Sequence, residues 1–126
     1  MISERLKLPV PVLLFPEGTS TDGSTVLRFH SRLFEPAIAA GAPITAASVR
    51  YSLEDGTSEK ELCWFGDESF FPHLVKTLNS ARISAEVRFG EARAYTDRRV
   101  AADKTRDEVV AMRATRSGVE KSALTI

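Results

Sequence analysis

The stretch Val10-Pro11-Val12-Leu13-Leu14-Phe15, followed at once by Pro16-Glu17-Gly18-Thr19-Ser20, carries most of the information on the fold. Its first six residues are almost wholly apolar and end at a turn signal, a pattern typical of a strand buried on both faces of an α/β sheet. Pro11 stands near the start of this strand, where a missing N–H is tolerated. From Pro16 to Ser24 the composition changes to Glu, Gly, Thr, Ser and Asp, which predicts a loop at the end of the strand.

A helix is expected to follow this loop. Ser31 can cap it, and Pro36 either kinks it or marks the first turn of a shorter helix. Gly41 supplies a C-terminal stop, and Pro43 prevents continuation. The apolar positions that suit its buried face are Leu33, Phe34, Ala37 and Ile38.

The rest of the chain predicts helices and strands in alternation. Strands are expected at 43–51, at 62–65 and at 82–89, where Ile83, Ala85, Val87 and Phe89 share one face. Helical spacing joins Phe70, Phe71, Leu74, Val75 and Leu78, and a charged helix is expected from about Val100 to Arg116. These patterns indicate an α/β fold with a mixed sheet flanked by helices over 1–116, then a disordered tail, 117–126.

Bulk composition excludes several classes of protein. The 126 residues suffice for one small domain, and the 17 basic and 17 acidic side chains cancel, which argues against a nucleic-acid partner. The single cysteine, Cys63, cannot form an internal disulfide or a multi-cysteine metal site, and it is interpreted as a buried small hydrophobe. No stretch approaches the roughly 18 apolar residues that span a bilayer. We expect no metal site and no resident cofactor.

The loop after the first strand is the candidate ligand site, because open α/β sheets place ligands at the carboxyl ends of their strands. Gly18 allows a sharp turn and close approach of the backbone to a ligand. Thr19, Ser20 and Thr21 offer hydroxyl and N–H groups that can hold phosphate oxygens, and Glu17 offers an acceptor. An ordinary polar turn is the alternative interpretation.

Phe15-Pro16-Glu17-Gly18-Thr19-Ser20 resembles the third sequence block of the glycerolipid acyltransferases, the 1-acylglycerol-3-phosphate acyltransferase family. Leu27-Arg28-Phe29 resembles the segment after that block, and Ala42 to Ala47 resembles the fourth block. Trp64 to Asp67 and Val87 to Glu91 resemble downstream family segments. The resemblance implies that 1–116 is the C-terminal part of an acyltransferase domain with a partial glycerolipid-acyltransferase fold.

The resemblance also implies site residues. Glu17, Gly18 and Thr19 match the part of block three that binds the polar head of the acceptor lipid, with Ser20 and Thr21 beside them. Pro43 and Ile44 would contact acyl chain or support the site. Ser20 stands where the family has an arginine, and a hydroxyl cannot replace bidentate phosphate binding. The acceptor is therefore expected to be lysophospholipid-like, with lysophosphatidate in doubt and lyso-ornithine lipid as an alternative. Arg28 is either a cation that substitutes for the missing arginine or a plain surface arginine.

The catalytic block of the family, Asn-His-x-x-x-x-Asp, has no match in this sequence, because no histidine precedes His30. Neither His30 nor His73 is a credible base, so no catalytic residue is assigned, and the chain alone is expected to be an inactive fragment. In the intact family the acyl donor is acyl-CoA or acyl-carrier protein. We expect these partners at the cytoplasmic face of a membrane, with attachment through segments outside this sequence. A non-catalytic lipid-binding module and an ordinary α/β domain are the alternatives.

Overall fold

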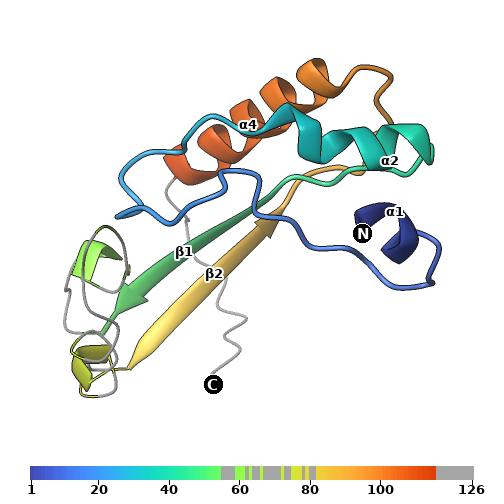
Figure 1. Cartoon of the computed structure of the whole chain (residues 1–126). Helices are drawn as coiled ribbons and strands as arrows, with labels where there is room; N and C mark the ends of the chain where they lie inside the picture. Colours follow the sequence, from blue (N-terminus) through green and yellow to red (C-terminus); the bar gives the residue numbers. More distant parts are fainter. Residues whose placement is uncertain are drawn as a thin grey trace.

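The computed structural model describes residues 1–54, 59–61, 63, 66, 72, 75–77, 79 and 82–115. Its elements are α1 (Ile2–Arg5), the 3-10 helix η1 (Ser31–Phe34), α2 (Glu35–Ala39), β1 (Ala47–Leu53), the 3-10 helix η2 (Glu59–Glu61), β2 (Ile83–Phe89) and α4 (Arg98–Ala114). Figure 1 shows α4 and α2 side by side above the two strands, with the N-terminal segment crossing in front of β1. The fold combines helices with an antiparallel pair of strands, so the prediction of an α/β class is confirmed in this general form.

The strand predicted at 10–15 is wrong as a strand, because this segment has no regular secondary structure. Among the described residues, no backbone N–H of Val10 to Phe15 donates a hydrogen bond to another backbone group. Extended apolar residues become a strand only when a neighbouring strand accepts and donates their ladder hydrogen bonds. The described part of the chain offers no such neighbour.

The helix expected after the loop forms in two pieces, η1 and α2. Pro36 lies in the first turn of α2, where its missing N–H costs no hydrogen bond. Gly41 ends the helix with φ +62°, and the N–H of Ala42 donates to the carbonyl of Ala37 at 2.9 Å. The expected cap at Ser31 is wrong, because η1 begins after His30 and no side chain caps it.

β1 and β2 pair antiparallel, with Ala47 opposite Phe89 and Leu53 opposite Ile83. The strand predicted at 82–89 is confirmed, and the one predicted at 43–51 begins later, at Ala47. Ile44 instead forms an isolated bridge, donating to the carbonyl of Arg93 at 2.8 Å. In the described residues the sheet has these two strands alone, antiparallel rather than mixed.

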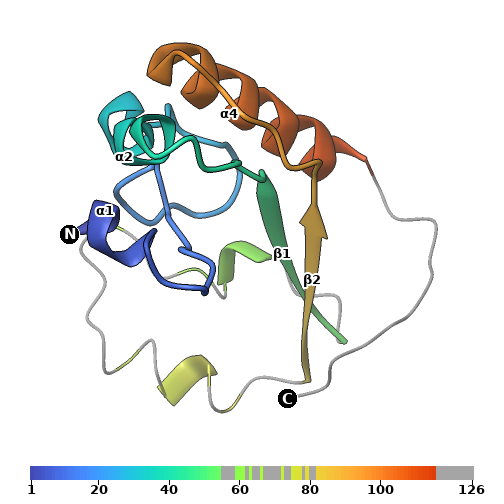
Figure 2. The same ribbon diagram turned by 90° about the vertical axis from the view of Figure 1, so that its right-hand side faces the viewer.

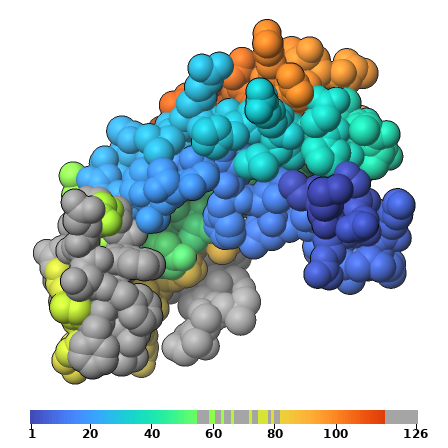
Figure 3. Space-filling view, viewed as in Figure 1, coloured from blue at the N-terminus to red at the C-terminus, as the bar shows by residue number. Residues whose placement is uncertain are grey.

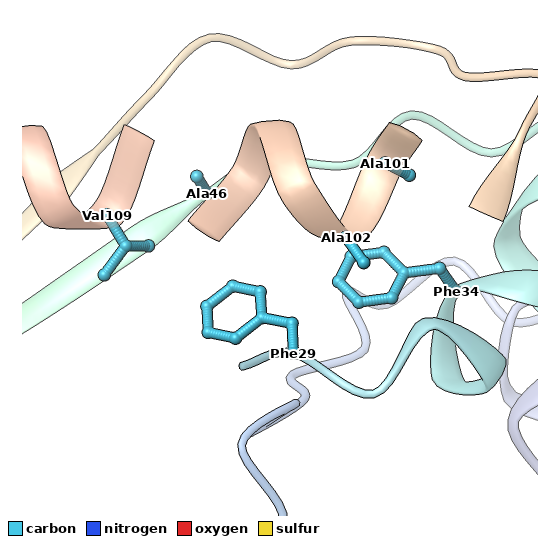
Figure 4. Packing of buried hydrophobic residues seen from close by; sticks show 6 residues of the cluster. All are labelled: Phe29, Phe34, Ala46, Ala101, Ala102 and Val109. Carbon is cyan, nitrogen blue, oxygen red and sulfur yellow. The ribbon is translucent and has the colours of Figure 1, made fainter. Parts of the chain in front are cut away.

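The last helix, α4, is close to its predicted bounds. Asp97 caps it, because Oδ1 accepts the N–H of Arg99 at 2.7 Å and that of Val100 at 3.0 Å. Its buried face packs on η1 and on the start of β1 (Figures 2 and 4). The buried cluster between these elements consists of Phe29, Phe34, Ala46, Ala101, Ala102 and Val109.

Several predicted segments fall outside the described residues. Most of the strand predicted at 62–65 lies there, including Trp64 and Phe65, and so does Asp67 at the end of the segment that resembles the family. The others are Phe70, Phe71, His73, Leu74, Leu78 and the tail 117–126. Of the helix predicted around 70–78, the described residues 72 and 75–77 are helical. In the parts of the chain that are described, no helix has the length and apolar character needed to cross a membrane.

Candidate functional site

The loop predicted as the ligand site opens with a tight turn at Gly18. The N–H of Gly18 donates to the carbonyl of Phe15 at 3.2 Å, and the N–H of His30 donates to the carbonyl of Pro16 at 2.9 Å. Gly18 has φ +73°, and a Cβ built on it would lie 3.0 Å from Nε2 of His30. Both the backbone conformation and the closeness of the imidazole therefore require glycine here.

Glu17 closes the loop on itself. Its Oε2 accepts the backbone N–H of Leu27 at 2.8 Å, ten residues along the chain. The side chain is half-buried, and this bond uses one of its two oxygens. Glu17 thus holds the beginning and the end of the loop together, while the second oxygen can accept a hydrogen bond from a ligand.

The polar residues of the loop tip are exposed or stabilise the turn. Thr19 and Ser20 are exposed, and among the described residues no protein acceptor pairs with their backbone N–H groups. Thr21 Oγ1 accepts the N–H of Gly23 at 3.2 Å. The predicted site residues 17–21 therefore form one contiguous surface, with Thr19 and Ser20 as its open part.

Asp22 has the strongest electrostatic perturbation in the loop. The hydroxyl of Ser24 donates to Oδ1 at 2.6 Å, the N–H of Ser24 donates to the same oxygen at 2.9 Å, and Lys60 lies 3.1 Å from Oδ2. These contacts lower the pKa of Asp22 from its ordinary 3.8 to about 2, with the Ser24 hydroxyl as the main cause. The carboxylate is charged at neutral pH and fixes the second half of the loop.

Two arginines of α4 donate hydrogen bonds to backbone carbonyls of the loop. Arg106 donates from Nε to the carbonyl of Leu27 at 2.9 Å and from Nη2 to the carbonyl of Val26 at 2.7 Å. Arg113 donates from Nη2 to the carbonyl of Gly23 at 2.7 Å. The candidate site is thus a loop whose shape is set by a helix about 80 residues further along the chain.

Arg113 also joins the loop to the sheet. Its Nη2 lies 2.9 Å from Oε2 of Glu59, and both side chains of this ion pair are less than one-fifth exposed. Glu59 Oε1 accepts the N–H of Tyr51 in β1 at 3.1 Å. These contacts surround a hollow of about 510 Å³, whose lining includes Arg50, Arg106 and Arg113.

The roles of Arg106 and Arg113 were not predicted from the sequence, which indicated only a charged helix here. The signal is present in the helical spacing: Ala102, Arg106, Val109 and Arg113 follow one another at intervals of four, three and four residues. Such positions share one face of a helix. Because Ala102 and Val109 are buried, both arginines also point toward the loop.

Arg28 lies just beyond the braced part of the loop. It is exposed, and with Phe29, His30, Ser31 and Arg32 it lines a hollow of about 330 Å³. This hollow adjoins the Gly18 turn through His30. The structure therefore brings Arg28 to the neighbourhood of 17–21, and its proposed contact with an acceptor stays a prediction.

Pro43 and Ile44 lie apart from the loop. Figure 1 shows the loop at the left of the molecule and the segment after α2 at the right. Pro43 is exposed, whereas Ile44 is half-buried against the core and pairs with Arg93. Their assignment as acyl-chain contacts stays a prediction, since no described contact joins them to residues 17–21.

Cys63 is a free thiol of intermediate exposure. Burial raises its pKa above the ordinary value, with smaller contributions from the carboxylates of Glu59 and Asp22. A raised pKa disfavours the thiolate, the reactive form. The raised pKa argues against a nucleophilic role, whereas the prediction that Cys63 is buried is met only in part, because the residue is of intermediate exposure.

The chain is similar to enzymes that acylate a lipid. It is 31% identical over 90 residues to a lyso-ornithine lipid O-acyltransferase of Pseudomonas aeruginosa, covering 71% of this chain and 34% of that protein. It is 36% identical over 89 residues to the Rhodobacter capsulatus enzyme of the same name, covering 68% and 32%. The Brucella abortus enzyme of that name is 32% identical over 126 residues, covering 88% and 47%.

These similarities support an acyltransferase of lipid metabolism, which agrees with the general class predicted from block three. The chain spans about a third to a half of the length of these relatives, between 32% and 47%. No family model matches the chain. No solved structure matches it either.

Proposed function

We propose that this chain forms the acceptor-binding part of an acyltransferase that moves a fatty acyl group to a hydroxyl of lyso-ornithine lipid. The observation that carries this proposal is the braced loop, where Glu17, fixed by Leu27, lies beside the exposed Thr19 and Ser20. The names of the relatives supply the acceptor class.

The chemistry of the loop favours this acceptor over a phosphate headgroup. Ser20 stands where the resembling family has arginine, so the loop lacks a guanidinium for bidentate phosphate binding. Glu17 instead offers a carboxylate oxygen, which attracts a cation and repels a phosphate. Ornithine is a diamino acid and can present an ammonium group to Glu17, while its carboxylate can pair with Arg28.

In the proposed reaction a base removes the proton of the acceptor hydroxyl, and the oxygen attacks the carbonyl carbon of an acyl thioester. The carbon–sulfur bond then breaks, and the thiol of coenzyme A or of acyl-carrier protein leaves. Loop 17–21 holds the acceptor headgroup so that its hydroxyl meets the thioester. The base is supplied by a part of the enzyme other than this chain, so the 126 residues alone release no thiol.

The reaction takes place at a membrane surface, because the acceptor is a lipid. Both proposed acyl donors are cytoplasmic molecules, so the proposal includes a location at the cytoplasmic face, peripheral or anchored by other segments. The 1-acylglycerol-3-phosphate acyltransferases remain the resembling family, and their fold is the one we propose for the intact domain.

A segment exchange tests the proposal. The matched 89 residues of the Rhodobacter capsulatus enzyme are replaced by the corresponding residues of this chain, and thiol release is followed with acyl-CoA and lyso-ornithine lipid or lysophosphatidate. We expect turnover with lyso-ornithine lipid and a loss of at least about ten-fold with Glu17→Ala. Turnover with lysophosphatidate alone contradicts the acceptor, and a folded, lipid-binding chimera without any turnover favours the non-catalytic module.

A further inference from the structure

The two-stranded sheet turns its polar face toward α4 and its apolar face away from it. On the α4 side, Arg88 donates to the carbonyls of Met112 and Thr115, each at 2.9 Å, and Arg50 donates to the carbonyl of Arg113. Successive side chains of a strand point to opposite faces of the sheet. The residues next to Arg50 and Arg88 in the sequence therefore point away from α4. This opposite side, the apolar sheet face, consists of Ala47, Val49, Tyr51, Leu53, Ile83, Ala85, Val87 and Phe89.

The apolar sheet face is open to solvent over part of its area, whereas Leu53 at its end is 8% exposed. Phe89 is 73% exposed, Val87 is 49% exposed and Tyr51 is 42% exposed. A sheet with one covered face normally buries its apolar side and leaves its polar side to water. Here the side that faces away from α4 carries the apolar residues, and this indicates that it is a contact surface.

The 10–15 segment gives a second, independent observation. Leu13 and Phe15 are each 74% exposed and Val10 is 56% exposed, and the segment lies on the surface that faces the viewer in Figure 3. Its backbone N–H groups donate to no described backbone acceptor. One additional strand beside this segment would cover apolar side chains and satisfy these N–H groups together.

The core formed by the described residues is also small. Among the described residues, no large side chain is fully buried, and alanine provides three of the seven buried apolar residues. These residues therefore leave apolar side chains in solvent that a second layer could cover.

We propose that the apolar sheet face and the 10–15 segment dock a further stretch of acyltransferase polypeptide, which adds at least one strand beside residues 10–15 and an apolar layer across β1 and β2. The relatives indicate this occupant, because this chain covers only 32% to 47% of their lengths. The identity of the occupant rests on the proposed function. The docking itself rests on the exposed apolar side chains and on backbone N–H groups that have no acceptor among the described residues.

A binding assay tests this inference without any catalytic step. The longest part of the Rhodobacter capsulatus enzyme outside its match is co-expressed with the tagged 126-residue chain, and co-purification and amide hydrogen exchange are measured. We expect co-purification, with slower exchange at 10–15. The double variant Val87→Glu, Phe89→Glu should lower the recovered partner at least about ten-fold, since both side chains lie in the interface.

The matched control is Ser52→Glu, Ser84→Glu, which places two acids on the opposite face of the same strands. It should leave recovery within about two-fold of the unchanged chain. Leu13→Glu is a second interface variant, far from the core, and circular dichroism of each variant verifies that α4 is retained. Failure of the partner to co-purify, or equal recovery with all variants, overturns the inference.

Separate measurements test two other occupants of the apolar sheet face, a second copy of the chain and a lipid surface. Sedimentation velocity of the chain alone would reveal a dimer, and flotation with vesicles of phosphatidylglycerol and phosphatidylcholine would reveal lipid binding. Either result, if abolished by Val87→Glu, Phe89→Glu while polypeptide recovery is unchanged, overturns the inference. A partner that docks as expected without yielding thiol release with lyso-ornithine lipid contradicts the proposed function and leaves the docking intact.

Discussion

The carboxylate of Glu17 and the backbone N–H of Leu27 are joined by a hydrogen bond of 2.8 Å, which ties the two ends of the loop together. Glutamine can make the same bond through its amide oxygen but carries no charge, whereas alanine makes none. The two substitutions therefore separate the structural role of Glu17 from an electrostatic one.

We expect Glu17→Ala to accelerate amide hydrogen exchange at Leu27 at least about ten-fold and Glu17→Gln to leave it nearly unchanged, because removing one partner of a bond to a charged group costs about 1.5–3 kcal/mol. In the segment-exchange chimera both variants should lower turnover if the charge binds the acceptor. Turnover with Glu17→Gln equal to that of the unchanged chimera would show that the bracing bond alone matters.

Gly18→Ala should destabilise the chain more than Gly41→Ala. Both glycines have positive φ, +73° and +62°, so both substitutions carry a backbone cost of roughly 1–2 kcal/mol. At Gly18 the new methyl group also meets the imidazole of His30 at 3.0 Å, whereas nothing lies within 4 Å at Gly41. Urea unfolding of the two variants measures the difference.

Adding His30→Ala to Gly18→Ala should remove the extra cost and bring the variant close to Gly41→Ala. If Gly18→Ala and Gly41→Ala have the same free energy of unfolding, the contact between Gly18 and His30 has no energetic weight.

Arg106→Ala should loosen the loop while leaving α4 helical. The guanidinium donates to two carbonyls, of Val26 and Leu27, and hydrogen bonds from a charged donor contribute about 1.5–3 kcal/mol. We expect faster hydrogen exchange across 23–27 and a loss of about 2 kcal/mol in the free energy of unfolding. Lys104→Ala, at an exposed position of the same helix, is the control and should change neither quantity.

The stability of the loop should fall at acid pH because of Asp22. The pKa of Asp22 is lowered from 3.8 to about 2 in the folded chain. The folded state therefore prefers the charged carboxylate, and the stabilisation is complete above pH 3.8 and is lost as the pH falls toward 2. Thermal unfolding followed between these pH values should show a decrease that Asp22→Asn reduces. An identical decrease in Asp22→Asn would assign the effect to other carboxylates.

Cys63 should react slowly with alkylating reagents. Its pKa is raised, mainly by burial, so less thiolate is present at pH 8 than in a free cysteine. The rate of iodoacetamide labelling should lie below that of a cysteine-containing peptide and should rise in urea. A folded-state rate equal to that of the peptide would contradict the burial of the thiol.

Local signals predicted the elements that depend on near neighbours. Pro36 and Gly41 correctly mark the start and the end of α2, and alternation correctly predicts β2. The strand at 10–15 was predicted from apolar character, yet a strand also needs a partner, and no described segment provides one. Alternation at 82–89 likewise identified an apolar face without showing that this face is exposed.

The loop at 16–24 was predicted together with its polar residues, because Gly18 and the run of hydroxyls leave a clear compositional signal. The contacts that hold the loop in shape could not be predicted from this compositional signal. Glu17 meets Leu27 across ten residues, and Arg106 meets Val26 across 80 residues. Such pairs depend on how α4 packs against the loop, which no local pattern encodes, although the helical spacing of Arg106 and Val109 indicates the inward face.

The arginine contacts beneath the loop have a consequence for its behaviour in salt. Arg106 binds carbonyl oxygens, which are neutral and do not titrate, and Arg113 binds a carbonyl oxygen and the partly buried carboxylate of Glu59. Dissolved ions screen exposed ion pairs such as Arg98 with Glu35, but they weaken partly buried contacts much less. The loop should therefore keep the same shape in dilute buffer and at high ionic strength, whereas the exposed ion pairs on the surface should weaken as the salt concentration rises.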